Sequence, residues 1–164
     1  MSQTFTPKAI TRDNFSKFGD LITTRDIEPI TINDGYAKRF NNIAKLDTSK
    51  ENGKTTISIF SASKRTFPMK VHMMESHPLG SQAFIPMKET TFLCFVAPSG
   101  VSLDLSKIES FIIPPGLGIN YKPGTWHFPL ISTEDMNFLV VDRKGSGDNL
   151  KIQKLDSENI VLKY

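Results

Sequence analysis

Residues 73–88 read MMESHPLGSQAFIPMK, two apolar segments joined by a Pro-Leu-Gly turn. Side chains two residues apart in an extended strand point to the same face, so Glu75 and His77 are predicted to project together. The turn reverses the chain, and Gln82 begins the next segment. We expect a hairpin here that returns Gln82 to the side of Glu75 and His77. The stretch therefore predicts a β structure that gathers polar side chains on one face.

The rest of the chain repeats this pattern of short extended segments between turns. Residues 54–62 alternate in polarity with period two, and residues 90–97 (TTFLCFVA) and 136–142 (MNFLVVD) are rich in strand formers. Only residues 11–20 read as a helix, with Thr11 as the N-cap. Turns rich in Pro and Gly recur at near-regular spacing, at residues 78–80, 98–100, 114–118, 123–124 and 145–149. This spacing predicts an all-β sandwich or jelly-roll barrel with one short N-terminal helix.

Length and composition bound the class of protein. The 164 residues, 38% of them hydrophobic, suit one domain over residues 1–164, and no linker or repeat divides the chain. Basic residues exceed acidic ones by 20 to 17, a scattered net charge of +3, so we expect no nucleic-acid partner. The single cysteine, Cys94, lies in an apolar run, which excludes a disulfide framework and favours a reducing compartment. Without a leader or an apolar run of about 18 residues, the expected location is the cytoplasm, away from membranes.

A second histidine extends the polar group of the opening stretch. Residues 118–127 read GINYKPGTWH, which places His127 just after a Pro-Gly turn, at the start of another extended segment. A barrel interior would bring His127 together with Glu75, His77 and Gln82. Convergent nitrogen and oxygen donors from separate strands suit a divalent cation. The alternative for Glu75 and His77 is a structural ion pair at a strand end.

The third histidine, His72, differs from the other two. By the period of two it points away from Glu75 and His77, unless a bulge shifts the strand. We therefore expect His72 at the surface or behind the site.

The spacing of the site candidates resembles the two motifs of the cupin superfamily. Glu75-x-His77-x4-Gln82 matches the ligand spacing of the first motif with altered residue types, and Gly124-x2-His127 matches part of the second. The resemblance implies a cupin-like double-stranded β-helix, a small jelly-roll barrel. It also implies a divalent metal at the barrel mouth, held by Glu75, His77, Gln82 and His127.

Five segments resemble the ureidoglycolate lyase family, in order and across nearly the whole chain. They are INDGYAKRF at residues 32–40, HPLGSQAFIP at 77–86, GINY at 118–121, WHFPL at 126–130 and VVDRKGSGDN at 140–149. The resemblance implies a homodimer of allantoin breakdown that splits (S)-ureidoglycolate, a small-molecule substrate, into glyoxylate and urea. It suggests nickel as the metal, while the residues themselves do not choose between nickel, manganese, zinc and none.

The chain departs from one part of the family pattern, which reads NYHRxxWHHP. Lys122, Pro123 and Phe128 stand where that pattern has two histidines and an arginine. Two alternatives stay open on this ground. One is a cupin isomerase or metal-dependent lyase for another small hydroxy or keto acid, and the other is a cupin that binds a metabolite without catalysis.

The family's reaction assigns roles to the candidate residues. Glu75 is the candidate base for the hydroxyl proton of the substrate. His77 and His127 are candidate metal ligands or, in a metal-free site, the acid and the donor to the oxyanion. Arg39 has a planar fork that suits the substrate carboxylate, and Lys88 is a second candidate for that role. The candidate substrate-binding residues are Arg39, Gln82, Lys88, Asn120 and Tyr121.

Overall fold

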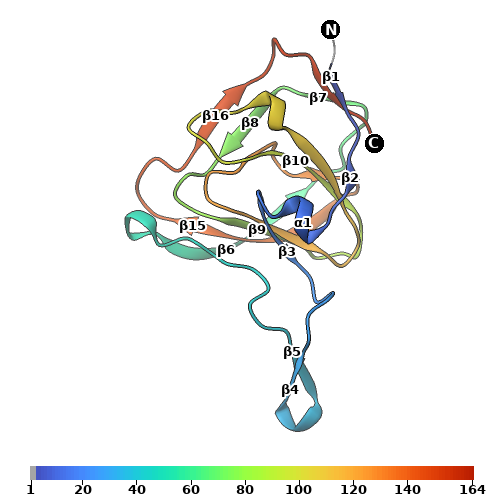
Figure 1. Ribbon diagram of the computed structural model, residues 1–164, viewed down its shortest axis with the longest axis vertical. Coiled ribbons are helices and arrows are strands. Elements are labelled where there is room, and N and C mark those ends of the chain that lie inside the picture. Colours follow the sequence, from blue (N-terminus) through green and yellow to red (C-terminus); the bar gives the residue numbers. More distant parts are fainter. Residues whose placement is uncertain (1–2) are drawn as a thin grey trace.

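The computed structural model describes residues 3–164, which are almost entirely β structure (Figure 1). No helix in this part of the chain is long and apolar enough to cross a membrane. The helical elements are α1 (Arg12–Phe15) and the short 3-10 helices η1 (Asn33–Gly35), η2 (Lys50–Asn52) and η3 (Leu105–Lys107). The strands are β1 (Gln3–Phe5), β2 (Lys8–Ala9), β3 (Gly19–Ile22), β4 (Ile30–Ile32), β5 (Ala37–Arg39), β6 (Lys54–Ala62), β7 (Met69–Val71), β8 (Met73–Ser76), β9 (Gln82–Pro86), β10 (Phe92–Ala97), β11 (Glu109–Ile113), β12 (Gly118–Tyr121), β13 (Trp126–His127), β14 (Ile131–Ser132), β15 (Met136–Lys144), β16 (Lys151–Lys154) and β17 (Ile160–Leu162).

Two large sheets pack against each other around the main core. One has the order β3-β12-β9-β15-β6, and the other has the order β16-β8-β13-β10-β11-β2, with β14 also paired to β10. Neighbouring strands are antiparallel except for β2, which runs parallel to β11. Phe92 and Phe111 of one sheet share a buried cluster with Phe84, Ile119 and Phe138 of the other. The apolar faces of the two sheets thus form a β-sandwich.

A second core lies on the other side of the seven-stranded sheet. The three-stranded sheet β1-β17-β7 covers it, and Val71 and Ile160 pack there with Phe95 and Trp126. Strand β10 passes between the two cores, so Cys94 belongs to the first and Phe95 to the second. Burial on both faces explains why the sequence of β10 is apolar without alternation.

The predicted N-terminal helix is present in α1 and begins after Thr11 as expected, but it is shorter than residues 11–20, because α1 ends at Phe15 and β3 begins at Gly19. The Thr11 hydroxyl accepts the backbone N–H of Asn14 at 3.1 Å, and the Asn14 side chain accepts the backbone N–H of Thr11 at 2.8 Å. This reciprocal pair satisfies two donors that a helix start leaves without partners. Phe15 and Phe18 are fully buried and pack edge-on against Phe111, so the helix covers part of the main core.

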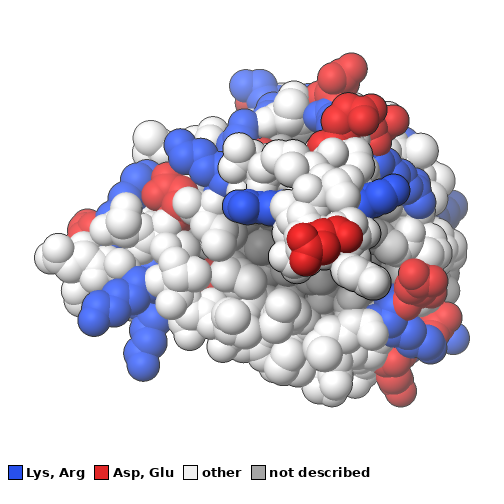
Figure 2. Space-filling view, turned by 90° about the horizontal axis from the view of Figure 1, so that it is seen from below, with Lys and Arg blue, Asp and Glu red and all other residues white. Residues whose placement is uncertain are grey.

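The hairpin of β4 and β5 projects from the body of the protein (Figure 1). Its register pairs Ile30 with Arg39 and Ile32 with Ala37. Tyr36, at the hairpin turn, is 93% exposed. Figure 2 views the protein from the end where this hairpin projects and shows basic and acidic side chains interspersed on that face.

The fold class is confirmed as a cupin-like β fold, although the sheets of residues 3–164 do not close into a continuous barrel. The hairpin predicted at residues 78–80 is wrong. Strand β8, which carries Glu75, pairs with β13 and β16, whereas β9, which begins at Gln82, pairs with β12 and β15. Both strands thus find their backbone hydrogen bonds elsewhere, and the turn carries the chain from one sheet to the other.

Candidate active site

Glu75, His77 and His127 meet beside a cavity between the two large sheets, and Glu75 is the one of the three that lines it. Strands β8 and β13 are antiparallel neighbours, and their register sets Glu75 directly opposite His127. His77 follows the end of β8 and keeps to the face of Glu75, as the period of two requires. Oε1 of Glu75 lies 3.3 Å from Nε2 of His127 and 3.8 Å from Nε2 of His77. One ligand atom of each residue lies within 4.8 Å of the others, so the three side chains converge.

Backbone carbonyls hold the two imidazole rings. Nδ1 of His77 lies 2.9 Å from the carbonyl oxygen of Asn149, and Nδ1 of His127 lies 3.2 Å from that of Thr125. A carbonyl oxygen only accepts, so Nδ1–H donates in both rings, and Nε2 of the neutral ring carries a lone pair. Both Nε2 atoms are buried without a well-directed hydrogen bond in residues 3–164. The Nε2 edges of both rings therefore face the Glu75 carboxylate, and a proton or a cation between them stabilises this arrangement.

Burial acts differently on the acid and on the imidazole. It raises the pKa of Glu75, but the 3.3 Å contact with His127 and the charges of both histidines outweigh it, and the pKa lies below its ordinary value. Burial and the neighbouring His127 lower the pKa of His77, and the Asn149 carbonyl, Glu75 and Asp142 offset only part of this change. Near neutral pH the site therefore holds an ionised Glu75 and a neutral His77.

Tyr121 supports His127 from behind. Its ring stacks on the imidazole, with the centroids 4.5 Å apart and the planes at 18°. Burial, followed by the nearby Cys94 thiol, raises the pKa of Tyr121 well above its ordinary value, so the phenol is neutral. The structure places this predicted substrate contact in the main core, where it fixes the plane of His127.

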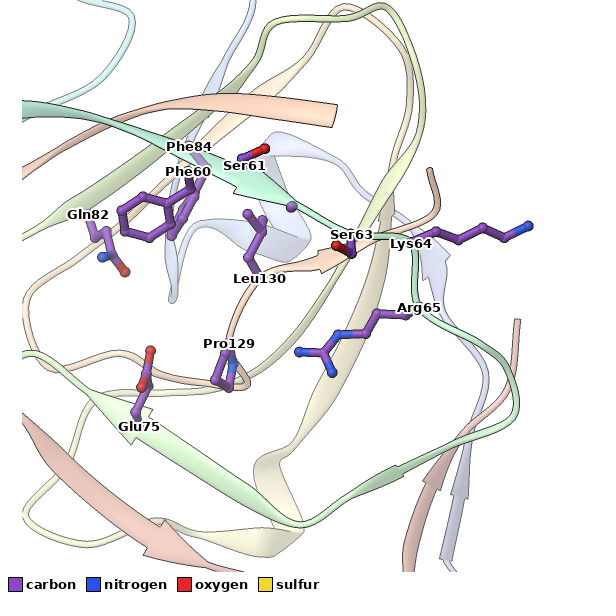
Figure 3. Close-up of a pocket in the computed structure, with 11 residues that line it drawn as sticks. Phe60, Ser61, Ser63, Lys64, Arg65, Glu75, Gln82, Phe84, Pro129 and Leu130 are labelled. Atoms are coloured by element: carbon purple, nitrogen blue, oxygen red, sulfur yellow. The ribbon is translucent and has the colours of Figure 1, made fainter. Parts of the chain in front are cut away.

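A cavity of about 500 Å³ opens beside Glu75 (Figure 3). Glu75 lines it from the seven-stranded sheet and Gln82 from the five-stranded sheet, and Figure 3 shows the two polar groups pointing toward each other. Phe60, Phe84 and Leu130 give the cavity apolar walls. Its volume and mixed lining suit a small polar molecule. The remaining lining residues are Ser61, Ala62, Ser63, Lys64, Arg65 and Pro129.

Gln82 joins the site although it comes from the opposite sheet. Its Nε2 donates to Oδ2 of Asp142 at 3.2 Å, which sets the orientation of the amide. Its Oε1 is buried and has no hydrogen-bond partner in the described part of the chain. The amide oxygen is therefore available to a ligand, either a metal ion or a donor group of a substrate.

Three predicted substrate-binding residues lie away from the cavity lining. Arg39 ends β5 on the projecting hairpin. Lys88 forms an ion pair with Glu134. Asn120 is fully buried, and its amide donates to Oδ2 of Asp20 at 3.1 Å and to a backbone carbonyl. The structure does not bring Arg39, Lys88 or Asn120 together with Glu75. The prediction missed this because the strand period shows which face a side chain is on but not what that face packs against.

His72 points away from the site, as the period of two predicts. It lies between β7 and β8 and is exposed. Its ring packs edge-on against Phe128, with the centroids 5.5 Å apart. The alternation of faces is thus kept from His72 to His77.

Sequence reasoning missed the cationic side of the cavity. Lys64 and Arg65 follow β6 and line the cavity that also contains Glu75. The only signal is the loop SASKRTFP at residues 61–68, which places two adjacent cations after a strand. The spacing of residues in this loop does not connect the two cations to Glu75. The packing of the two sheets brings the loop and Glu75 together, and the sequence does not show that packing.

The fold and the site define a class of protein. A cupin-like β-sandwich has a cavity between its sheets that a glutamate and a glutamine line, and two histidines contact the glutamate. The protein is therefore a cupin-like protein with the donor set of an enzyme or metal site.

Comparisons with known proteins identify the family. The sequence model of the ureidoglycolate lyase family matches residues 2–162. The chain is 43% identical over 154 residues to the ureidoglycolate lyase of Burkholderia mallei (strain NCTC 10229), which covers 93% of this chain and 90% of that protein. It is 41% identical over 148 residues to that of Pseudomonas syringae pv. tomato (90% and 87% covered) and 39% identical over 154 residues to that of Pseudomonas putida (93% and 92% covered). The chain belongs to the ureidoglycolate lyase family, and this prediction is confirmed.

Proposed function

We propose that this protein is a carbon-nitrogen lyase that cleaves (S)-ureidoglycolate into glyoxylate and urea. Relatives at 39% to 43% identity carry the name ureidoglycolate lyase. The observation that carries the proposal is the polar group in the cavity, where Glu75 lies 3.3 Å from His127 and 3.8 Å from His77. This group supplies a base and convergent donors, which the reaction requires.

The chemistry follows from the carbinolamide structure of the substrate. One carbon of ureidoglycolate carries a hydroxyl group, a carboxylate and a ureido nitrogen. When a base removes the hydroxyl proton, the oxygen electron pair forms the carbonyl bond of glyoxylate, and the carbon-nitrogen bond breaks. The departing nitrogen keeps the bonding electrons and takes up one proton, which releases urea. The proton lost by oxygen balances the proton gained by nitrogen, so no water is consumed.

Glu75 supplies the base in this scheme. Its lowered pKa keeps it ionised near neutral pH, and it lines the cavity from which the substrate would present its hydroxyl. Glu75 accepts the hydroxyl proton and returns it to the ureido nitrogen. The Nε2 edge of His127 faces the same position, and Oε1 of Gln82 accepts a hydrogen bond from a ureido N–H.

A divalent cation also fits this donor set. Glu75, His77 and His127 would hold it, with Oε1 of Gln82 as a further donor. The donor atoms of His77, His127 and Gln82 are buried and have no hydrogen-bond partner in residues 3–164. Imidazole and carboxylate ligands suit nickel, which the sequence resemblance suggests. When bound, a divalent cation supplies Lewis-acid stabilisation of developing negative charge on a substrate oxygen. A carboxylate has two oxygens, so with one of them toward a cation Glu75 would still have the other for the proton.

The departures from the family pattern do not remove a cavity residue. Phe128 is 2% exposed and belongs to the second core, where it packs beside Trp126. Lys122 donates to the backbone carbonyl of Ser16. The cavity therefore keeps Glu75, and Glu75 keeps its contacts with His77 and His127, which favours the lyase over the alternative cupin functions.

Three further properties belong to the same proposal: a role in allantoin breakdown, assembly as a homodimer and a cytoplasmic location. The projecting hairpin and the edge strand β6 support a dimer. Ile57 and Ile59 on β6 are 66% and 52% exposed and offer an apolar surface to a second copy. The buried, unpaired Cys94 suits a reducing compartment.

The test is product analysis with racemic ureidoglycolate. We expect glyoxylate and urea in equal amounts, consumption of half of the racemate and no ammonia, because one rigid cavity holds one arrangement of the three substituents. A parallel reaction with a chelator measures the contribution of a metal. Ammonia in amounts equal to glyoxylate would indicate an amidohydrolase and overturn the proposal.

A further inference from the structure

Two adjacent cations at the cavity point in different directions. Lys64 and Arg65 follow β6, and both contribute to the lining. Figure 3 shows the guanidinium of Arg65 turned toward Pro129 and the cavity, whereas the ammonium group of Lys64 points away. The backbone N–H of Lys64 donates to Oδ1 of Asp135 at 2.7 Å, so an acidic side chain lies beside this residue. Arg65 is thus the cation aimed at a ligand in the cavity.

Arg65 is held in place without being neutralised. Its backbone N–H donates to the carbonyl oxygen of Ser132 at 2.9 Å. Its guanidinium carbon lies 5.5 Å from the ring centroid of Phe128. Among residues 3–164 it forms no ion pair with an acidic side chain. An aromatic contact of this kind leaves the in-plane N–H donors free, so Arg65 can still bind an anion.

We propose that Arg65 binds the carboxylate of the substrate and thereby orients the substrate against Glu75. The guanidinium presents parallel N–H donors that match the two oxygens of a carboxylate. The substrate carboxylate also has to avoid the ionised Glu75, and Arg65 draws it to another part of the cavity. The hydroxyl and ureido groups are then left facing Glu75 and Gln82. This inference rests on the proposed function.

The other cations considered for this role have different surroundings. Lys88 is paired with Glu134, and breaking that pair would reduce the gain from binding a second carboxylate. Arg39 lies on the projecting hairpin of the same chain. Arg65 alone combines a place in the cavity lining, an inward direction and a free charge within residues 3–164.

The first test compares the kinetics of Arg65→Gln, Arg65→Lys and the matched control Lys64→Gln. The control removes an equal charge from the neighbouring residue, whose side chain points away. Loss of a charge-assisted pair is expected to raise KM for ureidoglycolate on the order of 10- to 100-fold in Arg65→Gln, with a smaller change in kcat. Arg65→Lys keeps a point charge and should recover part of the loss, whereas Lys64→Gln should stay within about twofold of the wild type.

The second test measures binding of glycolate and of its neutral counterpart glycolamide by calorimetry, without turnover. The wild type and Lys64→Gln should prefer glycolate, and Arg65→Gln should lose at least about tenfold of this preference. Equal preference in Arg65→Gln and wild type, or no preference in the wild type, would overturn the proposal. Melting temperatures check folding, and Arg65→Lys gives the same comparison if Arg65→Gln is unstable. A wild type that binds glycolate but releases no glyoxylate would refute the lyase function while leaving the Arg65 site standing.

Discussion

Replacement of Glu75 by Gln is the most direct test of the catalytic site. The substitution keeps the shape of the side chain and removes its charge and basicity. Burial opposes the charge of Glu75, while contacts with His127 and His77 favour it, so these effects partly cancel in the free energy of unfolding. We therefore expect a small change in melting temperature. The rate of the reaction should fall instead, because the substrate hydroxyl then has no carboxylate to accept its proton. In the wild type that carboxylate lies 3.3 Å from Nε2 of His127.

The expected magnitude follows from the single role given to Glu75. A positioned general base contributes on the order of 10² to 10⁴ in rate, equivalent to about 2.7 to 5.4 kcal/mol of transition-state stabilisation. Glu75→Gln should therefore lower kcat by this factor and change KM little, since the amide still fills the same volume. Glyoxylate release at saturating ureidoglycolate gives kcat, and the dependence on substrate concentration gives KM.

Glu109→Gln provides a matched control. Glu109 is also a partly buried carboxylate, and its ion pairs with Lys17 and Lys8 outweigh burial and lower its pKa. It does not line the cavity that contains Glu75, so its replacement should leave kcat unchanged. The reasoning fails if Glu75→Gln retains kcat within about threefold of the wild type with an unchanged melting temperature. A rise in KM alone would make Glu75 a binding residue instead of the base.

Three further predictions follow from the same geometry. After incubation with nickel, His77→Ala and His127→Ala should each retain less metal than the wild type, whereas His72→Ala, whose ring faces away, should retain as much. Equal loss in all three would contradict the alternation of faces. His77 has a lowered pKa, and the proposed function uses its neutral form, so activity should be present above that pKa and lost as pH falls through it. The acid limb of the activity profile should lie below the ordinary histidine value of 6.5, and a midpoint above it would refute the assignment. Burial raises the pKa of Cys94, so a thiol reagent should modify it rapidly only after unfolding, and fast reaction of the native protein would contradict its position in the core.

Local patterns in the sequence predicted several parts of the site and the fold. The Glu75-x-His77 spacing predicts a shared face, because a strand alternates its side chains whatever it packs against. The same rule turns His72 away. The capping pattern at Thr11 predicts the start of α1, because both of its hydrogen bonds lie within one turn. The family resemblance also gave the cupin-like fold and the lyase family.

The same patterns did not predict which elements become neighbours. The turn after His77 was expected to form a hairpin, yet Gln82 reaches the cavity from the opposite sheet. A turn signal shows that the chain changes direction, but the competition between all strands for backbone partners decides where it goes. For this reason the sequence by itself did not show that Lys88 would pair with Glu134 or that Arg65 would line the cavity.

The sequence by itself thus determined the strand content, the N-terminal helix and the common face of Glu75 and His77, since each depends on residues close together in the chain. The tertiary structure decided that His127, 52 residues beyond Glu75 (127 minus 75), would lie directly opposite it on the neighbouring strand. It also decided that Gln82 and Arg65 would border the same cavity. These positions depend on strand register and sheet packing, which are set by the burial of two apolar cores over the whole chain.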